Sequence, residues 1–264
     1  MTLPVVAVPT PPFCPPGPWD DWRAALLDRA RVAPENPQHA QVAQVVAQLV
    51  ERHSPGHDGL IPQSLALVLE QCALAHLEEQ KRGSFDCLTL EIGAYKGATT
   101  LAILELMRCL HPADRQPLVV TVDPYGGKPY NGGNTAGIHT DQLYGDPIYG
   151  TAKTNLAAYT NHAHFLLTGE DFLRRCMGAR YWQLGEPRVL NHVTFAFVDG
   201  DHDAHTIVAE CQLLIPLMRP GARLVVDNVD MDTHTVNELQ GLLPGVKLSA
   251  QSPRGALQAY WAAP

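Results

Sequence analysis

The feature that most constrains the fold is an alternation of short apolar runs and amphipathic segments that begins near residue 85. Apolar runs of this length, rich in Val, Leu, Ile and Phe, are typical of strands that are buried on both faces. We expect these strands at residues 87–92, 118–123, 164–168, 193–199 and 222–227. Helical patterns lie between them at residues 97–110, about 151–159, 170–178 and 203–218. The alternation predicts an α/β fold with a doubly wound, mainly parallel sheet.

Two more strands are expected at the end of the chain. Residues 245–251 and 255–262 are joined at a Ser-Pro-Arg-Gly turn and should pair as an antiparallel hairpin. The prediction is therefore a seven-stranded sheet that ends in this hairpin.

The chain divides into three parts by composition. Residues 1–18 contain seven prolines and predict an extended arm, which permits a homodimer without requiring one. Residues 19–84 predict an N-terminal helical cap, with helices over 20–31, 38–52 and 60–81. Residues 85–264 form the α/β domain. Its segment 125–150, with seven glycines, is either a lid-like insertion that carries function or an unstructured one.

Charge and composition exclude several classes of protein. The formal charge is −8, from 19 basic and 27 acidic residues, which argues against a nucleic-acid partner. No apolar stretch approaches 18 residues, so no membrane span is expected. The six cysteines are scattered without a CxxC pair, and the start of the chain lacks the pattern of a secretory signal. We therefore expect a cytoplasmic protein.

A glycine-containing turn follows the first predicted strand. Glu91-Ile92-Gly93-Ala94-Tyr95-Lys96-Gly97 lacks the GxGxxG spacing that accommodates a pyrophosphate. Asp123, at the end of the second strand, could accept both hydroxyls of a ribose. Thr99 and the backbone amides at the next helix start could hold an amino-acid group. These features favour a nucleoside ligand such as S-adenosylmethionine (SAM); the alternative is a tight turn beside a surface Asp.

Five segments carry a resemblance to a known family: LEIGAYKGATTLAI, TVDPY, LLTGEDF, FAFVDGDHDAH and RPGARLVVDNV. They resemble class I SAM-dependent methyltransferases of the catechol and caffeoyl-CoA O-methyltransferase type, over about residues 85–262. The resemblance implies a Rossmann-like fold and a small-molecule acceptor. It also implies that the cofactor is contacted by Glu91, Gly93, Tyr95, Gly97 and Thr99 at its methionine half, Asp123 at the ribose, Gly169, Glu170 and Asp171 at the adenine, and Asp199.

Acidic residues end two adjacent predicted strands. Asp199 and Asp227 should converge at one edge of a parallel sheet, and Asn228 follows directly. Carboxylate and amide oxygens suit Mg²⁺, and the resemblance implies the same three residues as ligands of a divalent ion. The alternative is that Asp199 orients the cofactor while Asp227 and Asn228 cap a turn.

His202 lies three residues after Asp199, in Asp-Gly-Asp-His. The catechol-type relatives carry a Lys base at this position, whereas an unperturbed His titrates near pH 6.5 and suits proton removal. A metal-ligand or packing role for His202 stays open. Asp-Gly-Asp-His also resembles sugar and antibiotic-tailoring methyltransferases, so the acceptor could be phenolic, a sugar or a natural product.

The predicted function is therefore a SAM-dependent O-methyltransferase of small molecules, assisted by Mg²⁺, with His202 as general base. The alternatives are a metal-independent methyltransferase of the same fold, an NAD-dependent oxidoreductase and a non-catalytic cofactor-binding module. His53 and His57 lie in a Pro/Gly segment and are predicted to belong to a solvated loop; the alternative is that this loop faces the substrate.

Overall fold

The computed structural model describes residues 23–24, 26–28, 37–57, 59–83, 88–125, 129–130, 138–139, 146–183, 185–201, 203–227, 246–251 and 258–262. The predicted arm at 1–18 and most of the segment 125–150 lie outside these ranges, as do His202 and Asn228. Among the described residues, none of the helices combines the length and hydropathy that a bilayer crossing requires.

The main sheet has seven strands in the order β10-β11-β9-β8-β1-β2-β5. Their bounds are β1 Leu88–Ile92, β2 Leu118–Val122, β5 His162–Phe165, β8 Val193–Val198, β9 Met218–Val226, β10 Val246–Gln251 and β11 Gln258–Ala262. The five strands from β9 to β5 are parallel, whereas β11 pairs antiparallel with both β9 and β10. The predicted fold class is confirmed, including its closing hairpin.

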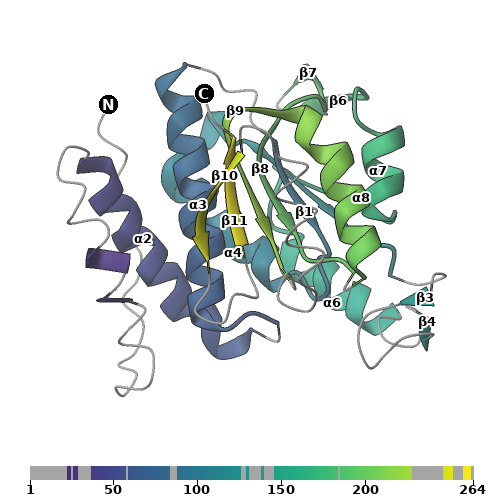
Figure 1. The fold of residues 1–264 in the computed structure, drawn as a ribbon, viewed down its shortest axis with the longest axis horizontal. Helices are drawn as coiled ribbons and strands as arrows, with labels where there is room; N and C mark the ends of the chain where they lie inside the picture. Colours follow the sequence, from purple (N-terminus) through teal and green to yellow (C-terminus); the bar gives the residue numbers. More distant parts are fainter. Residues whose placement is uncertain are drawn as a thin grey trace.

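Helices cover both faces of this sheet (Figure 1). One face packs against α2 (Pro37–His53), α3 (Pro62–Lys81), α4 (Ala98–Leu110) and Leu156 of α6 (Asp146–Leu156). The other face packs against α7 (Gly169–Arg175) and α8 (Ala204–Leu214). Apolar burial of this kind, at about 25 cal/mol per Å², is the main driving force for such layers. The helices α2 and α3 share one hydrophobic core with the sheet.

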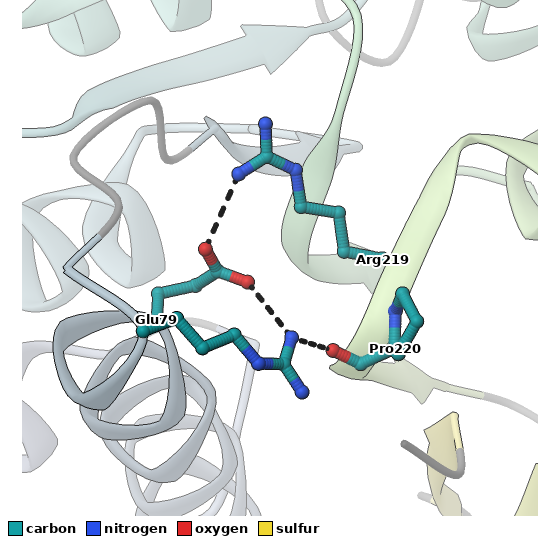
Figure 2. Close-up of polar contacts among 4 residues, drawn as sticks. Glu79, Arg219 and Pro220 are labelled. Atoms are coloured by element: carbon teal, nitrogen blue, oxygen red, sulfur yellow. Dashed lines mark hydrogen bonds and ion pairs between the residues drawn. The ribbon is translucent and has the colours of Figure 1, made fainter.

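Polar contacts also fasten α3 to β9. The buried Glu79 carboxylate lies 3.4 Å from Arg82 Nη1 and 3.3 Å from Arg219 Nη1. Figure 2 shows Glu79 reaching Arg219 from the end of the helix, next to Pro220 of the strand. Arg82 also donates to the Pro220 carbonyl. These contacts join segments about 140 residues apart in the chain.

Several element boundaries differ from the predictions. The predicted helix 203–218 is wrong at its end: α8 stops at Leu214, and Met218 already begins β9 after a 3-10 turn over Ile215–Leu217. Pro216 in that turn has no N–H for an α-helical bond, which accounts for the early stop. The third strand comes two residues earlier than predicted, because Thr168 is the N-cap of α7 and not part of the strand.

Short elements outside the main sheet were not predicted. A hairpin pairs β6 (Arg180–Gln183) with β7 (Glu186–Val189). Within the segment 125–150, β3 (Pro129–Tyr130) pairs with β4 (Ile138–His139), and α6 begins at Asp146.

Candidate functional site

The carboxyl ends of β1, β2, β8 and β9 lie side by side, and we call this border the carboxyl edge. Gly93 turns the chain there, with φ +91° and its N–H donating to the Val122 carbonyl at 2.8 Å. A Cβ atom on Gly93 would lie 2.0 Å from the carbonyl oxygen of Asp199. Only glycine therefore allows the turn after β1 to approach the end of β8 this closely.

The Asp123 carboxylate organises the turn after β1. Its Oδ2 accepts hydrogen bonds from the backbone N–H groups of Ala94 and Tyr95, each at 3.0 Å. Its Oδ1 accepts from the N–H of Tyr125 at 3.0 Å. A carboxylate has about four acceptor positions, and the described residues occupy three of them. Burial raises the pKa of Asp123, while these backbone hydrogen bonds lower it.

Two tyrosines beside Asp123 adopt backbone conformations that are rare for non-glycine residues. Tyr95 has φ +45° and Tyr125 has φ +47°. The Tyr125 hydroxyl donates to the Tyr95 carbonyl, which joins the turns after β1 and β2. Strained backbone of this kind persists only where surrounding contacts hold it, and it is concentrated at functional sites.

Glu91 of β1 is fully buried just before this turn. It accepts a hydrogen bond from the Thr100 hydroxyl at the start of α4. Burial raises the pKa of Glu91 to about 8, and the negative charge of Asp123 adds to the effect. Glu91 therefore stays largely protonated at neutral pH.

The side chains of Asp199 and Asp227 meet at the ends of β8 and β9, as predicted. Burial raises the pKa of Asp199 well above its usual value, and the charge and hydrogen bond of Asp227 raise it further. Two adjacent carboxylates cannot both ionise easily, so the pair retains a proton unless a cation is present. Within the described residues, no group of three or more His, Cys, Asp or Glu side chains forms a metal site.

The predicted adenine residues form the first turn of α7. Gly169 is buried so closely that an added Cβ would lie 2.7 Å from Ile92 Cγ2 at the end of β1. Glu170 is exposed and pairs with Arg174 at 2.8 Å. Asp171 accepts from the Thr168 hydroxyl at 3.1 Å and pairs with Arg175 at 3.2 Å. The structure thus brings Gly169 next to the carboxyl edge, while both acids contact arginines of their own helix.

Two further residues were not predicted. The prediction of a solvated loop is wrong for His53, which ends α2 and lies 3.1 Å from Glu105. His57 is not purely solvated either, because its Nε2 lies 3.1 Å from Thr99 Oγ1. Glu210 of α8 is 3% exposed, and its carboxylate lies against Gly169. Sequence pattern could have located Glu210, since it falls on the apolar stripe of Ile207, Cys211 and Leu214. No sequence pattern places His57 beside Thr99.

The carboxyl edge therefore combines a glycine turn, a carboxylate that accepts from three backbone N–H groups and a pair of acids. A family model described as a methyltransferase domain matches residues 90–229. A search of curated proteins finds no significant match.

Among solved structures, the O-methyltransferase NovP aligns with a TM-score of 0.55 and 12% identity, covering 85% of this chain and 98% of that chain. An O-methyltransferase from Bacillus cereus, in complex with SAH, aligns with a TM-score of 0.49 and 17% identity, covering 93% and 99%. The O-methyltransferase TomG from Streptomyces achromogenes, in complex with SAM, aligns with a TM-score of 0.48 and 15% identity, covering 94% and 100%. The likeness to NovP shows a shared fold. Since the family model matches more than half of the 264 residues, this chain belongs to the methyltransferase domain family, as the sequence resemblance predicted.

Proposed function

We propose that this chain is a SAM-dependent O-methyltransferase that acts on a hydroxyl group of a phenolic, sugar or natural-product acceptor. The observation that carries the proposal is the meeting of the Gly93 turn, Asp123 and the Asp199–Asp227 pair at one edge of a methyltransferase-family sheet. The shared fold with NovP, an O-methyltransferase, is in line with transfer to oxygen.

The cofactor would lie along the turns after β1 and β2 and the first turn of α7. Asp123 would accept one ribose hydroxyl, and Glu91, Gly93, Tyr95, Gly97 and Thr99 would surround the methionine half. Gly169, Glu170 and Asp171 would flank the adenine, with Asp199 also near the cofactor. SAM supplies the reactive methyl group on a sulfonium, so the protein has to bind, orient and exclude water.

A divalent cation fits the two described acids. Asp199 and Asp227 share a hydrogen bond and repel each other when ionised, and a cation would relieve that repulsion. We propose Asp199, Asp227 and Asn228 as its ligands, which suit Mg²⁺. A cation at this position would lower the pKa of an acceptor hydroxyl. His202, three residues after Asp199, would then remove the hydroxyl proton.

Calorimetric titration with S-adenosylhomocysteine (SAH) and with NAD⁺ tests the cofactor. We expect SAH to bind with a micromolar dissociation constant and NAD⁺ not to bind; the reverse result would establish an oxidoreductase instead.

Titration with Mn²⁺ in the presence of SAH tests the cation. We expect one site in the parent chain and about a tenfold or greater loss of affinity in Asp227→Asn, because a charged oxygen ligand is removed. Asp114→Asn, an exposed acid near the start of β2, is the matched control. Methyl transfer that continues fully in EDTA would favour the metal-independent alternative.

A further inference from the structure

A side chain from outside the matched methyltransferase segment reaches the proposed cofactor site. His57 follows the 3-10 turn Ser54–Gly56 between α2 and α3, whereas the family model begins at residue 90. Its Nε2 lies 3.1 Å from Oγ1 of Thr99, in the first turn of α4. The N-terminal helices therefore contribute a polar contact to the turn after β1.

The backbone around His57 determines which ring nitrogen carries the proton. Nδ1 accepts hydrogen bonds from the N–H groups of Gly59 at 3.2 Å and Leu60 at 2.9 Å. A nitrogen that accepts from two N–H groups cannot itself carry a proton, so the neutral ring is protonated at Nε2. Nε2–H therefore donates to Thr99 Oγ1.

This donation leaves the Thr99 hydroxyl proton available for another acceptor. A hydroxyl has one donor and two acceptor positions, and the His57 contact uses an acceptor position. Thr99 is 7% exposed, and the described residues provide no acceptor for its O–H. A buried donor without a protein partner is costly unless a ligand satisfies it.

We propose that His57 is a positioning residue that directs the Thr99 O–H toward the carboxylate of the cofactor's amino-acid part. This inference rests on the proposed function, because it needs a SAM-type ligand in the site. It goes beyond that function by giving the helices α2 and α3 a part in cofactor recognition.

Two ligands separate this role from a purely structural one. SAH carries the amino-acid carboxylate, whereas 5′-methylthioadenosine has the same nucleoside and thioether without it. We expect His57→Leu to raise the dissociation constant of SAH about 5- to 10-fold, the effect of one lost hydrogen bond between neutral side chains. Binding of 5′-methylthioadenosine should change less than twofold.

Three further variants sharpen the test. His57→Gln keeps an amide N–H the same number of bonds from the backbone and should recover most of the SAH affinity. Thr99→Val should lose as much SAH affinity as His57→Leu, and the double variant should lose little more, because the two side chains act in one chain of hydrogen bonds. His192→Leu, an exposed His at the opposite end of β8, is the control and should bind SAH as the parent does.

Each outcome has one reading. An equal loss for both ligands in His57→Leu, or additive losses in the double variant, would overturn the inference and leave His57 a structural residue. Unchanged SAH binding in His57→Leu would also overturn it. If the parent chain bound neither ligand, the proposed function itself would fail.

Discussion

Two regions of this molecule bury polar side chains, and they differ in whether those side chains have hydrogen-bond or ion-pair partners. On α3, three buried polar side chains have nearby partners: Gln71 accepts from Arg223 at 2.6 Å, His76 Nε2 lies 2.7 Å from Thr89 Oγ1, and Glu79 contacts two arginines. At the carboxyl edge, the buried groups are mostly acids that raise one another's pKa.

Glu210 shows the contrast most clearly. Its Oε2 is buried without a hydrogen-bond partner among the described residues, and the nearby acids Asp201 and Glu170 raise its pKa further. Satisfied polar networks stabilise and specify a fold, whereas clustered acids with raised pKa values cost stability and are typical of functional sites. The α3 contacts therefore fit a role in folding, whereas the acids of the carboxyl edge are in line with the proposed ligand site.

The largest expected effect is on catalysis at the carboxyl edge. Asp199→Asn removes one of the two acids proposed to hold the cation, and we expect kcat/KM for methyl transfer to fall about 10²- to 10³-fold, as for loss of one preorganised electrostatic contact. The same change replaces a buried acid, whose ionisation is unfavourable, by a neutral amide, so the free energy of unfolding without ligands at pH 8 should rise by about 1 kcal/mol. Steady-state kinetics and urea unfolding measure the two effects.

Substitution of a functional acid should lower kcat/KM and raise the free energy of unfolding, whereas substitution of a structural acid should lower the free energy of unfolding. Asp114→Asn serves as the exposed control and should change neither quantity. If Asp199→Asn instead lost stability and kept its activity, the carboxyl edge would resemble the α3 region and the comparison would fail.

A matched pair of Glu→Gln substitutions, one in each region, tests the same comparison by the free energy of unfolding, without an activity measurement. Glu79 is 2% exposed at its side chain and is paired with Arg82 and Arg219. We expect Glu79→Gln to lower the free energy of unfolding by about 2 kcal/mol, less than for a fully buried ion pair because both arginines reach solvent. Glu210 is similarly buried, and its Oε2 has no hydrogen-bond partner among the described residues, so Glu210→Gln should leave the free energy of unfolding unchanged or raise it at pH 8.

Urea unfolding at pH 8 compares the two variants directly. An equal loss in both would mean that Glu210 has a stabilising partner, and the distinction between the two regions would not hold.

Much of the fold could be predicted because buried parallel strands have a recognisable, mainly apolar sequence pattern. The strands β1, β2 and β8 lie within one residue of their predicted ends, since each is a short run dominated by apolar residues and buried along its whole length. The start of β9 at Met218 could not be predicted, because Arg219-Pro220-Gly221 reads as a helix end. Tertiary contacts, including Arg82 with the Pro220 carbonyl, hold that sequence in a strand.

Within the candidate site, the positions that could be predicted are those of residues directly after the carboxyl end of a strand. Strand order alone places Asp199 beside Asp227, and their contact follows from the parallel sheet. The contact of His57 with Thr99 depends on how α2 and α3 dock, which no local pattern encodes. Likewise, three backbone N–H groups already engage Asp123, a detail set by the path of the turns and invisible in the sequence.

The smallest expected effect, and the most direct comparison, is the dependence of stability on pH. Burial raises the folded-state pKa values of Glu91 and Glu210 to about 8, above those of the unfolded chain. The contribution of these two acids to the free energy of unfolding is therefore complete below about pH 4.5 and is lost as the pH rises through 8. Buried histidines act oppositely: burial lowers the pKa of His111 to about 4, so its stabilisation is lost as the pH falls below 6.5.

Between pH 7.5 and 8.5 buried histidines such as His111 are largely neutral in both the folded and the unfolded state, so the acids at the carboxyl edge determine the slope. We expect the free energy of unfolding to decrease over this window, by about 0.7 kcal/mol for a single acid with a folded pKa of about 8. Glu210→Gln should flatten the decrease measured by urea unfolding, whereas Glu79→Gln should shift the whole curve down without changing its slope. A parent curve that rises with pH across this window would show that the buried acids are already ionised and compensated, which would remove the basis for treating the carboxyl edge as a site that awaits a cation or ligand.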